Sequence, residues 1–210
     1  MSYVVVLDYG SGNLRSAERA LERAGASVTV TADAAAALAC DGLVVPGVGA
    51  FAACMAGLRA VGGDELIAKR VAAGRPVLGI CVGMQVLFAA GAEHGIQTSG
   101  CGVWPGVVER LETGALPLPH MGWNTVSFAS GSSLFRGIPA DTRFYFVHSY
   151  ALRAEQAGGL PDTALISWTT HGERFGAAVE HGLVAATQFH PEKSGDAGFA
   201  VLSNWLGGLE

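Results

Sequence analysis

The stretch Pro76-Val77-Leu78-Gly79-Ile80-Cys81-Val82-Gly83 decides how the rest of the chain is interpreted. An apolar run typical of a buried strand leads into a cysteine between glycines, and a helix is predicted to follow over 84–90. A sharp strand-to-helix turn presents the side chain at its tip, where flanking glycines avoid Cβ clashes. Backbone N–H groups that open the helix favour negative charge on the sulfur. The pattern fits a nucleophile and, equally well, a small buried thiol.

Composition and charge narrow the class of protein. The chain has 210 residues, of which 50% are hydrophobic and 15% are charged. These values suit a compact α/β protein whose central strands are covered on both faces. No repeat, low-complexity linker or charge run marks a boundary, so we expect one domain over 1–210. The formal net charge of −5 argues against a nucleic-acid partner.

Cysteine usage and the N-terminus indicate a cytoplasmic protein. The four cysteines lie far apart and form no C-x-x-C pair, which argues against a disulfide framework or a structural zinc site. Residues 1–8 lack the basic region of a signal peptide. The uncharged run over 76–92 is better explained by two buried elements joined by a turn than by a membrane helix.

Strand and helix patterns alternate in the first half of the chain. Strands are predicted over 4–7, 27–31, 43–45 and 77–80, and helices over 14–24, 34–39 and 64–73. The alternation implies right-handed crossovers and an open, mostly parallel sheet flanked by helices, that is, an α/β fold.

The second half of the chain is richer in strands. They are predicted over 143–151, 163–168, 175–180 and 183–189, with a hairpin turn at His181-Gly182. A closing helix is predicted over 196–206, with Phe199, Leu202 and Leu206 on its apolar face.

The residues His190-Pro191-Glu192 offer a base for the cysteine. A cysteine needs a base to become a thiolate near neutral pH, and that base needs an orienting group. Residues two apart on an extended backbone point to the same side, so Glu192 is predicted to lie beside the His190 ring. A surface turn would explain these three residues taken alone. Because Cys81 ends another strand of the same predicted sheet, a catalytic pair is favoured.

A glycine-rich turn follows the third strand and could stabilise an oxyanion. Pro46-Gly47-Val48-Gly49-Ala50-Phe51 could direct the N–H groups of Val48 and Gly49 toward Cys81, and the N–H of Val82 is the natural second donor. A βα turn without function is the alternative.

A dinucleotide-binding loop is only weakly indicated. Gly10-Ser11-Gly12 follows the first strand, and Asp33 lies roughly where a ribose-binding acid would. However, Arg15 stands where the third Gly or Ala of that motif belongs, and a lone G-x-G is not specific.

The residues around Cys81, from Gly79 to Gln85, together with Phe189-His190-Pro191-Glu192-Lys193-Ser194, resemble the class I glutamine amidotransferases. Further stretches are similar to the glutaminase subunits of imidazole glycerol phosphate synthases, and they run in the family's order from residue 8 to about 195. These are Asp8-Tyr9-Gly10-Ser11-Gly12-Asn13-Leu14, Pro46 to Phe51, His120-Met121-Gly122-Trp123-Asn124 and Phe146-Val147-His148-Ser149-Tyr150. Val82 replaces a commoner Leu and Gly195 a common Gln, so any side-chain role at position 195 is in doubt.

This resemblance implies a flavodoxin-like fold with added antiparallel strands in the C-terminal half. It also implies that Cys81 attacks glutamine, that His190 relays a proton to the leaving ammonia, and that Glu192 orients His190. At the amino-acid end of the substrate it implies a contact from Gln85, with backbone contacts from His148, Ser149 and Tyr150. No metal and no organic cofactor are implied.

The resemblance further implies a partner subunit. Members of the family pass ammonia to a separate (β/α)8-barrel cyclase, which makes imidazole glycerol phosphate and aminoimidazole carboxamide ribotide in histidine biosynthesis. Asn13 and Trp123 are candidates for that interface, with core packing as the alternative for Trp123. Because a coupled enzyme should not waste glutamine, we hypothesise that the oxyanion turn is misaligned in the isolated subunit, since Gly47 and Gly49 permit a peptide flip.

Three other functions stay open on the sequence. The chain could serve a different ammonia-using synthase, act as a stand-alone cysteine hydrolase of similar fold, or be a catalytically idle interaction subunit.

Overall fold

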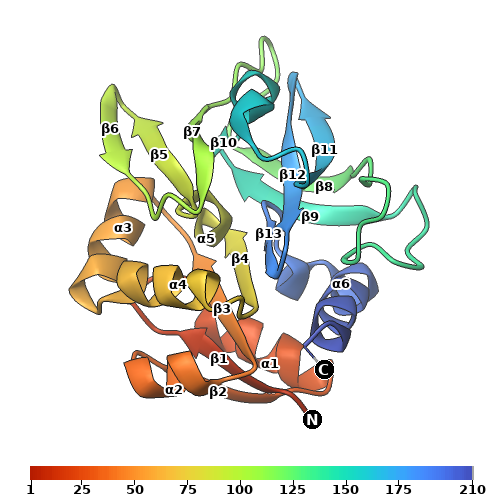
Figure 1. Cartoon of the computed structure of the whole chain (residues 1–210). Coiled ribbons are helices and arrows are strands. Elements are labelled where there is room, and N and C mark those ends of the chain that lie inside the picture. Colours follow the sequence, from red (N-terminus) through yellow and green to blue (C-terminus); the bar gives the residue numbers. More distant parts are fainter. Residues whose placement is uncertain (210) are drawn as a thin grey trace.

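The computed structural model describes residues 1–209, which fold around a seven-stranded sheet (Figure 1). Its strands are β1 (Tyr3–Leu7), β2 (Ser27–Thr31), β3 (Gly42–Gly47), β4 (Val77–Cys81), β11 (Leu165–His171), β12 (Glu173–His181) and β13 (Val184–Thr187). The order across the sheet is β11-β12-β13-β4-β3-β1-β2. The strands from β13 to β2 run parallel, and β11 and β12 are antiparallel additions. The predicted α/β class and mostly parallel sheet are confirmed.

Helices cover both faces of this sheet, as the buried central strands require. They are α1 (Leu14–Arg23), α2 (Ala34–Ala39), α3 (Phe51–Ala60), α4 (Gly63–Ala72) and α6 (Gly195–Gly207). Helices α1 and α6 pack together on one face, and α4 contacts α2 and α3 on the other (Figure 1). Residues 4–7 of β1 are therefore completely buried, which explains their uninterrupted apolar sequence.

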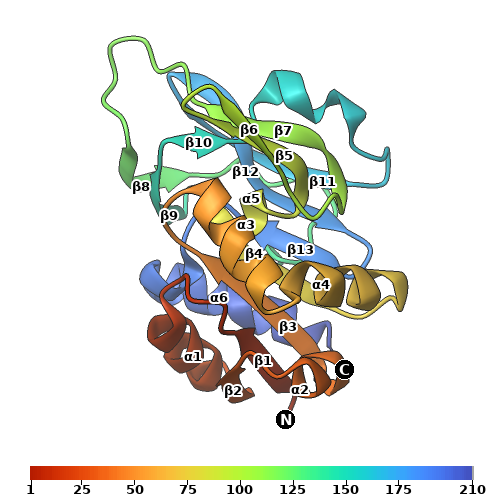
Figure 2. The ribbon, with the colours of Figure 1, turned by 90° about the vertical axis from the view of Figure 1, so that its left-hand side faces the viewer.

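Smaller strand groups lie beyond the carboxyl ends of the parallel strands (Figure 2). One sheet has the order β10-β7-β5-β6, and a separate antiparallel pair joins β8 to β9. The bounds are β5 (Phe88–Glu93), β6 (Ile96–Ser99), β7 (Trp104–Arg110), β8 (His120–Thr125), β9 (Arg143–His148) and β10 (Tyr150–Ala151). Two 3-10 turns, η1 (Ala154–Gly159) and η2 (Pro191–Lys193), complete the assignment.

The helix predicted over 84–90 is wrong. A single turn, α5 (Val82–Gln85), follows Cys81, and the chain then enters β5, which pairs with β6 and β7. A short apolar run is compatible with a buried helix and with a buried strand, so pairing with the adjacent β6 and the more distant β7 decided its conformation. Helix α3 was not predicted.

Smaller differences have local causes. The strand predicted over 143–151 is divided at Ser149 between β9 and β10, which belong to different sheets. The β12–β13 hairpin turns at Gly182-Leu183, one residue later than predicted, because His181 pairs with Val184. Phe199 is only partly buried, with the Arg23 guanidinium 4.9 Å above its ring. Within residues 1–209, none of the helices has the length and apolar character needed to cross a membrane.

Candidate active site

Cys81 occupies a sharp turn between β4 and α5. Its backbone has φ 57° and ψ −114°, a positive-φ conformation that is uncommon for residues other than glycine. A Cβ at position 83 would overlap the carbonyl oxygen of Val45, and a Cβ at position 79 would lie 2.6 Å from that of Gly83. The glycines on either side of Cys81 are therefore required by close backbone packing, as the G-x-C-x-G pattern suggests.

His190 and Glu192 form a buried pair beside this turn. Nδ1 of His190 lies 2.7 Å from Oε1 of Glu192, and the two side chains are 2% and 3% exposed. The contact was predicted from an extended backbone, but Glu192 reaches the ring through the 3-10 turn η2. The backbone N–H of His190 donates to the carbonyl of Tyr145 at 2.9 Å, which fixes its place three residues beyond the end of β13.

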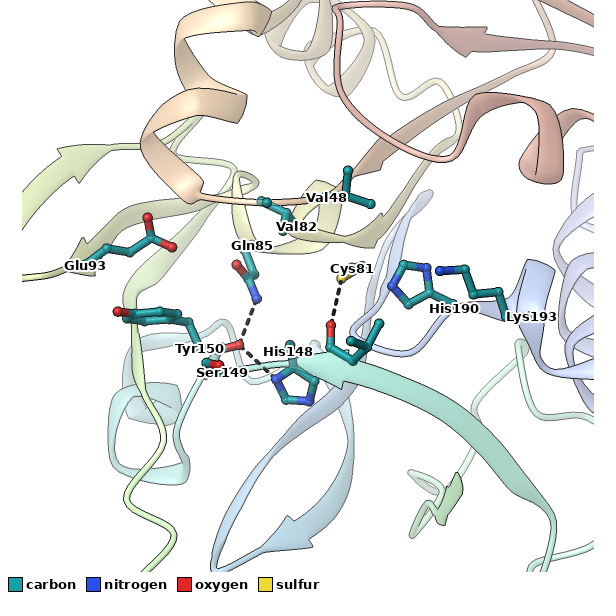
Figure 3. A pocket seen from close by; sticks show the side chains of 12 residues that line it. Val48, Cys81, Val82, Gln85, Glu93, His148, Ser149, Tyr150, His190 and Lys193 are labelled. Carbon is teal, nitrogen blue, oxygen red and sulfur yellow. Dashed lines mark hydrogen bonds between the residues drawn. The ribbon is translucent and has the colours of Figure 1, made fainter. Parts of the chain in front are cut away.

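The imidazole of His190 is held toward its charged form. Burial lowers its pKa, but interaction with Cys81 and Glu192 outweighs this and raises the pKa to about 9. Its buried Nε2 has no hydrogen-bond partner within residues 1–209, and the ring lies next to Cys81 (Figure 3). The arrangement is that of a thiol, a base and an orienting carboxylate.

A cavity of about 180 Å³ opens beside Cys81. It brings together the predicted residues Val48, Gly49, Cys81, Val82, Gln85, His148, Ser149, Tyr150 and His190. Glu93, Val147 and Lys193 also line it and were not predicted. Within the described part of the chain, His, Cys, Asp and Glu side chains form no group of three that could hold a metal ion.

The predicted oxyanion donors do not all face the cavity. The N–H of Val48 donates to Oγ of Ser11 at 3.2 Å, and the same hydroxyl donates to the carbonyl of Val48 at 2.9 Å. Gly49 adopts φ +85° with nothing within 4 Å of a hypothetical Cβ. The N–H of Val48 is therefore engaged with the β1–α1 loop rather than with the cavity.

Gln85 is held by its amide nitrogen. Nε2 donates to the carbonyl of Tyr150 at 2.8 Å and to Oε1 of Gln188 at 3.0 Å (Figure 3 shows the first bond). Gln188 is fully buried, and its Nε2 lies 3.8 Å from the sulfur of Cys81. Sequence reasoning missed Gln188, although a polar Thr187-Gln188 pair inside an apolar strand was a usable signal.

Glu93 is the second residue missed. Its Oε2 accepts the N–H of Phe51 at 3.0 Å, at the start of α3. The sequence prediction assigned residues 88–90 of its strand β5 to the end of a helix and assigned no element to Glu93.

The two proposed interface residues lie outside the cavity lining. Trp123 on β8 is 53% exposed, so core packing does not explain it. Asn13 is the N-cap of α1 and its backbone carbonyl accepts the N–H of Ala17 at 3.0 Å.

Comparisons with known proteins agree on the family. The family model "Glutamine amidotransferase class-I" matches residues 5–206. Imidazole glycerol phosphate synthase subunit HisH of Mycobacterium tuberculosis (strain CDC 1551 / Oshkosh) is 69% identical over 206 residues, or 98% of each chain. The subunit of the same name from Nocardia farcinica is 65% identical over 208 residues, again 98% of each chain.

Solved structures of lower identity share the fold. A glutamine amidotransferase matches with a TM-score of 0.72 at 21% identity, over 95% of this chain and 98% of that one. PurLQS from Thermotoga maritima matches with a TM-score of 0.69 at 20% identity, over 100% of both chains. The chain therefore belongs to the class-I glutamine amidotransferases, and within them to the family of the imidazole glycerol phosphate synthase subunit HisH.

Proposed function

We propose that this chain hydrolyses glutamine and delivers the ammonia to a cyclase subunit that makes imidazole glycerol phosphate in histidine biosynthesis. The observation that carries the proposal is the placement of Cys81 at a strained turn, next to the His190–Glu192 pair, on the wall of one cavity. The names of its relatives supply the pathway.

The proposed chemistry runs through a thioester. The thiol proton of Cys81 passes to His190, the sulfur attacks the carboxamide carbon of glutamine, and the C–N bond breaks as His190 gives that proton to the leaving ammonia. Water then attacks the γ-glutamyl thioester, His190 accepts a proton from that water, and glutamate leaves as the thiol is restored. Glu192 keeps Nδ1 of His190 as the protonated nitrogen, so that Nε2 faces the reaction.

The amino-acid end of glutamine has complementary groups in the cavity. Because both N–H groups of Gln85 are used within the protein, its Oε1 is left as an acceptor. That oxygen and the carboxylate of Glu93 suit the substrate's ammonium group. We assign backbone contacts with the rest of glutamine to Ser149 and Tyr150.

The position of Val48 supports the hypothesis of a misaligned oxyanion turn. Its N–H is bound to Ser11, so the site holds one predicted donor in an unproductive direction. We propose that the cyclase, when its own substrate is bound, releases this contact, and that Val48, Gly49 and Val82 then bind the oxyanion.

We propose a (β/α)8-barrel cyclase as the partner, docked on the face that carries Asn13 and Trp123. Met121 and Trp123 on β8 are 64% and 53% exposed, which leaves apolar area for an interface. All four cysteines are free thiols, which fits an enzyme of the reducing cytoplasm.

The test measures glutamate release by the purified chain, alone and with the cyclase subunit of a close relative plus its substrate. We expect slow hydrolysis alone, strong stimulation by the loaded cyclase, and loss of turnover in Cys81→Ala with docking retained. Hydrolysis by Cys81→Ala would refute the nucleophile. A full rate without cyclase would refute the misaligned turn. No turnover with any cyclase would favour an idle interaction subunit.

A further inference from the structure

Two buried histidines pair with one another, and one of them, His148, lines the cavity. His120 on β8 and His148 at the end of β9 are 5% and 7% exposed. Nδ1 of His120 is 3.1 Å from Nε2 of His148, and Nδ1 of His148 is 3.0 Å from the carbonyl oxygen of Tyr150. Neither ring has a buried polar atom without a partner. Such full pairing in the interior points to a specified network rather than to incidental packing.

Backbone groups at both ends fix the direction of every hydrogen bond. The Tyr150 carbonyl can only accept, so Nδ1 of His148 carries the proton, and Nε2 of this neutral ring accepts from Nδ1 of His120. Nε2 of His120 in turn accepts from Nδ2 of Asn124 at 3.3 Å. The Asn124 amide is anchored because Nδ2 donates to the carbonyl of Thr170 at 3.0 Å and Oδ1 accepts the N–H of Thr125 at 2.9 Å.

Both rings remain neutral at the pH at which enzymes of this kind work. Burial, together with the neighbouring histidines, lowers the pKa of His120 to about 4 and that of His148 to about 3. Consequently the tautomers described above do not change near neutral pH, and the donor and acceptor directions are constant.

The same carbonyl joins these histidines to the catalytic cysteine. The Tyr150 oxygen accepts from His148 on one side and from Nε2 of Gln85 on the other (Figure 3). Gln85 also donates to Oε1 of Gln188, which turns the Gln188 Nε2 toward the sulfur of Cys81. The Gln188 amide is therefore a hydrogen-bond donor to the Cys81 sulfur. The hydrogen-bond chain thus runs from Asn124 through His120, His148, the Tyr150 carbonyl, Gln85 and Gln188 to Cys81.

We propose that His120 and His148 are positioning residues, which hold the Tyr150 carbonyl so that the Gln85 amide faces the substrate and the Gln188 amide faces Cys81. The inference rests on the proposed glutaminase function, and neither histidine touches the reacting atoms. If the Tyr150 carbonyl loses its donor from His148, the bond from Gln85 is left to hold it, and both amides lose one constraint on their orientation.

The test compares His148→Phe with His148→Asn and His120→Phe. Phenylalanine keeps the ring and removes both polar atoms, whereas asparagine keeps a donor near the Nδ1 position. His171→Phe is the matched control, because His171 stacks on His120 at 4.3 Å but bonds only to the carbonyl of Pro117, outside the hydrogen-bond chain. Glutaminase kinetics are measured with the cyclase present, and iodoacetamide alkylation of the Cys81 peptide is followed by mass spectrometry on the chain alone.

We expect His148→Phe to lose about tenfold in kcat/KM, mainly as a rise in KM for glutamine, and to alkylate several-fold more slowly. His120→Phe should show smaller changes in the same direction, His148→Asn should recover most of the loss, and His171→Phe should match the wild type. Unchanged kinetics and alkylation in folded His148→Phe would overturn the proposal, as would equal losses in His171→Phe.

Two further outcomes, a variant that does not fold and a wild type without activity, can be distinguished from failure of the proposal. If His148→Phe fails to fold, His148→Asn and His120→Phe decide the question, and wild-type values in both would overturn the proposal. If the wild type shows no glutaminase activity at all, the proposed function fails, while the alkylation rates still test the positioning of Gln188.

Discussion

The Glu192→Gln substitution tests whether the carboxylate stabilises a charged His190. In the folded protein the pKa of His190 lies at about 9, against an ordinary value of 6.5. Because each tenfold change in proton affinity corresponds to about 1.4 kcal/mol, the protonated ring contributes about 3 kcal/mol to the free energy of unfolding below pH 6.5. This contribution is lost as the pH rises from 6.5 through 9, since the unfolded chain releases its proton first.

Glutamine at position 192 keeps an acceptor for Nδ1 but removes the negative charge. Burial of His190 lowers its pKa, and the interactions with Cys81 and Glu192 oppose that effect together. If removal of the carboxylate charge cancels about half of this net rise in the pKa of His190, the stability of the variant should fall by about 1.5 kcal/mol less than that of the wild type between pH 6 and pH 9.5. Urea unfolding at a series of pH values measures this difference, and groups common to both proteins cancel.

The same substitution should lower glutaminase kcat about 10- to 100-fold, because the imidazolium formed during the reaction loses its counter-charge. Parallel stability curves for the two proteins over pH 6 to 9.5 would refute the reasoning about His190. A normal kcat in the variant would refute the orienting role of Glu192.

Three other changes test separate parts of the structure. Gly83→Ala should prevent stable folding, because the new methyl group overlaps the backbone of Val45; a melting temperature within about 2 °C of wild type would contradict the packing described. Ser11→Ala should raise the basal glutaminase rate several-fold without cyclase, because the N–H of Val48 loses its partner. An unchanged or lower rate would argue against the proposal that the bond to Ser11 keeps the Val48 N–H from the oxyanion. Arg70→Met should lower the melting temperature by roughly 10 °C, because buried Arg70 donates to the carbonyls of Ala37, Cys40, Asp41 and Pro76; a small effect by thermal unfolding would show that these carbonyls find other donors.

The parts of the site that local sequence rules govern were predictable. The turn at Cys81 depends on two glycines that lie within two residues of it, and Glu192 contacts His190 through one turn of chain. Such short-range constraints leave a pattern in the sequence. The parallel sheet was predictable for a similar reason, since β1, β3 and β4 are buried and carry almost only apolar residues.

The parts that long-range pairing governs were not predictable from local patterns. Residues 88–93 form a strand that pairs with the adjacent β6 and also with β7, more than ten residues later. Glu93 itself pairs with Ile96 across the short β5–β6 hairpin, so the long-range pairing of β5 concerns residues 88–91. The orientation of the Gln188 side chain depends on a hydrogen bond from Gln85, which is distant in sequence and approaches it only in the folded chain.

The site has two parts with different proposed functions, one on the central sheet and one on the smaller strand groups. The ends of β3, β4 and β13 carry Val48, Cys81 and His190, so the proposed chemistry depends on the central sheet. Tyr150 and the histidines behind it belong to β8, β9 and β10, outside that sheet. Because β8 also presents Trp123 on its exposed side, a partner that presses on this strand would act first on the orientation of Gln85 and only then on the cysteine. On this view, substitutions in β8 should change the KM for glutamine more than the reactivity of Cys81.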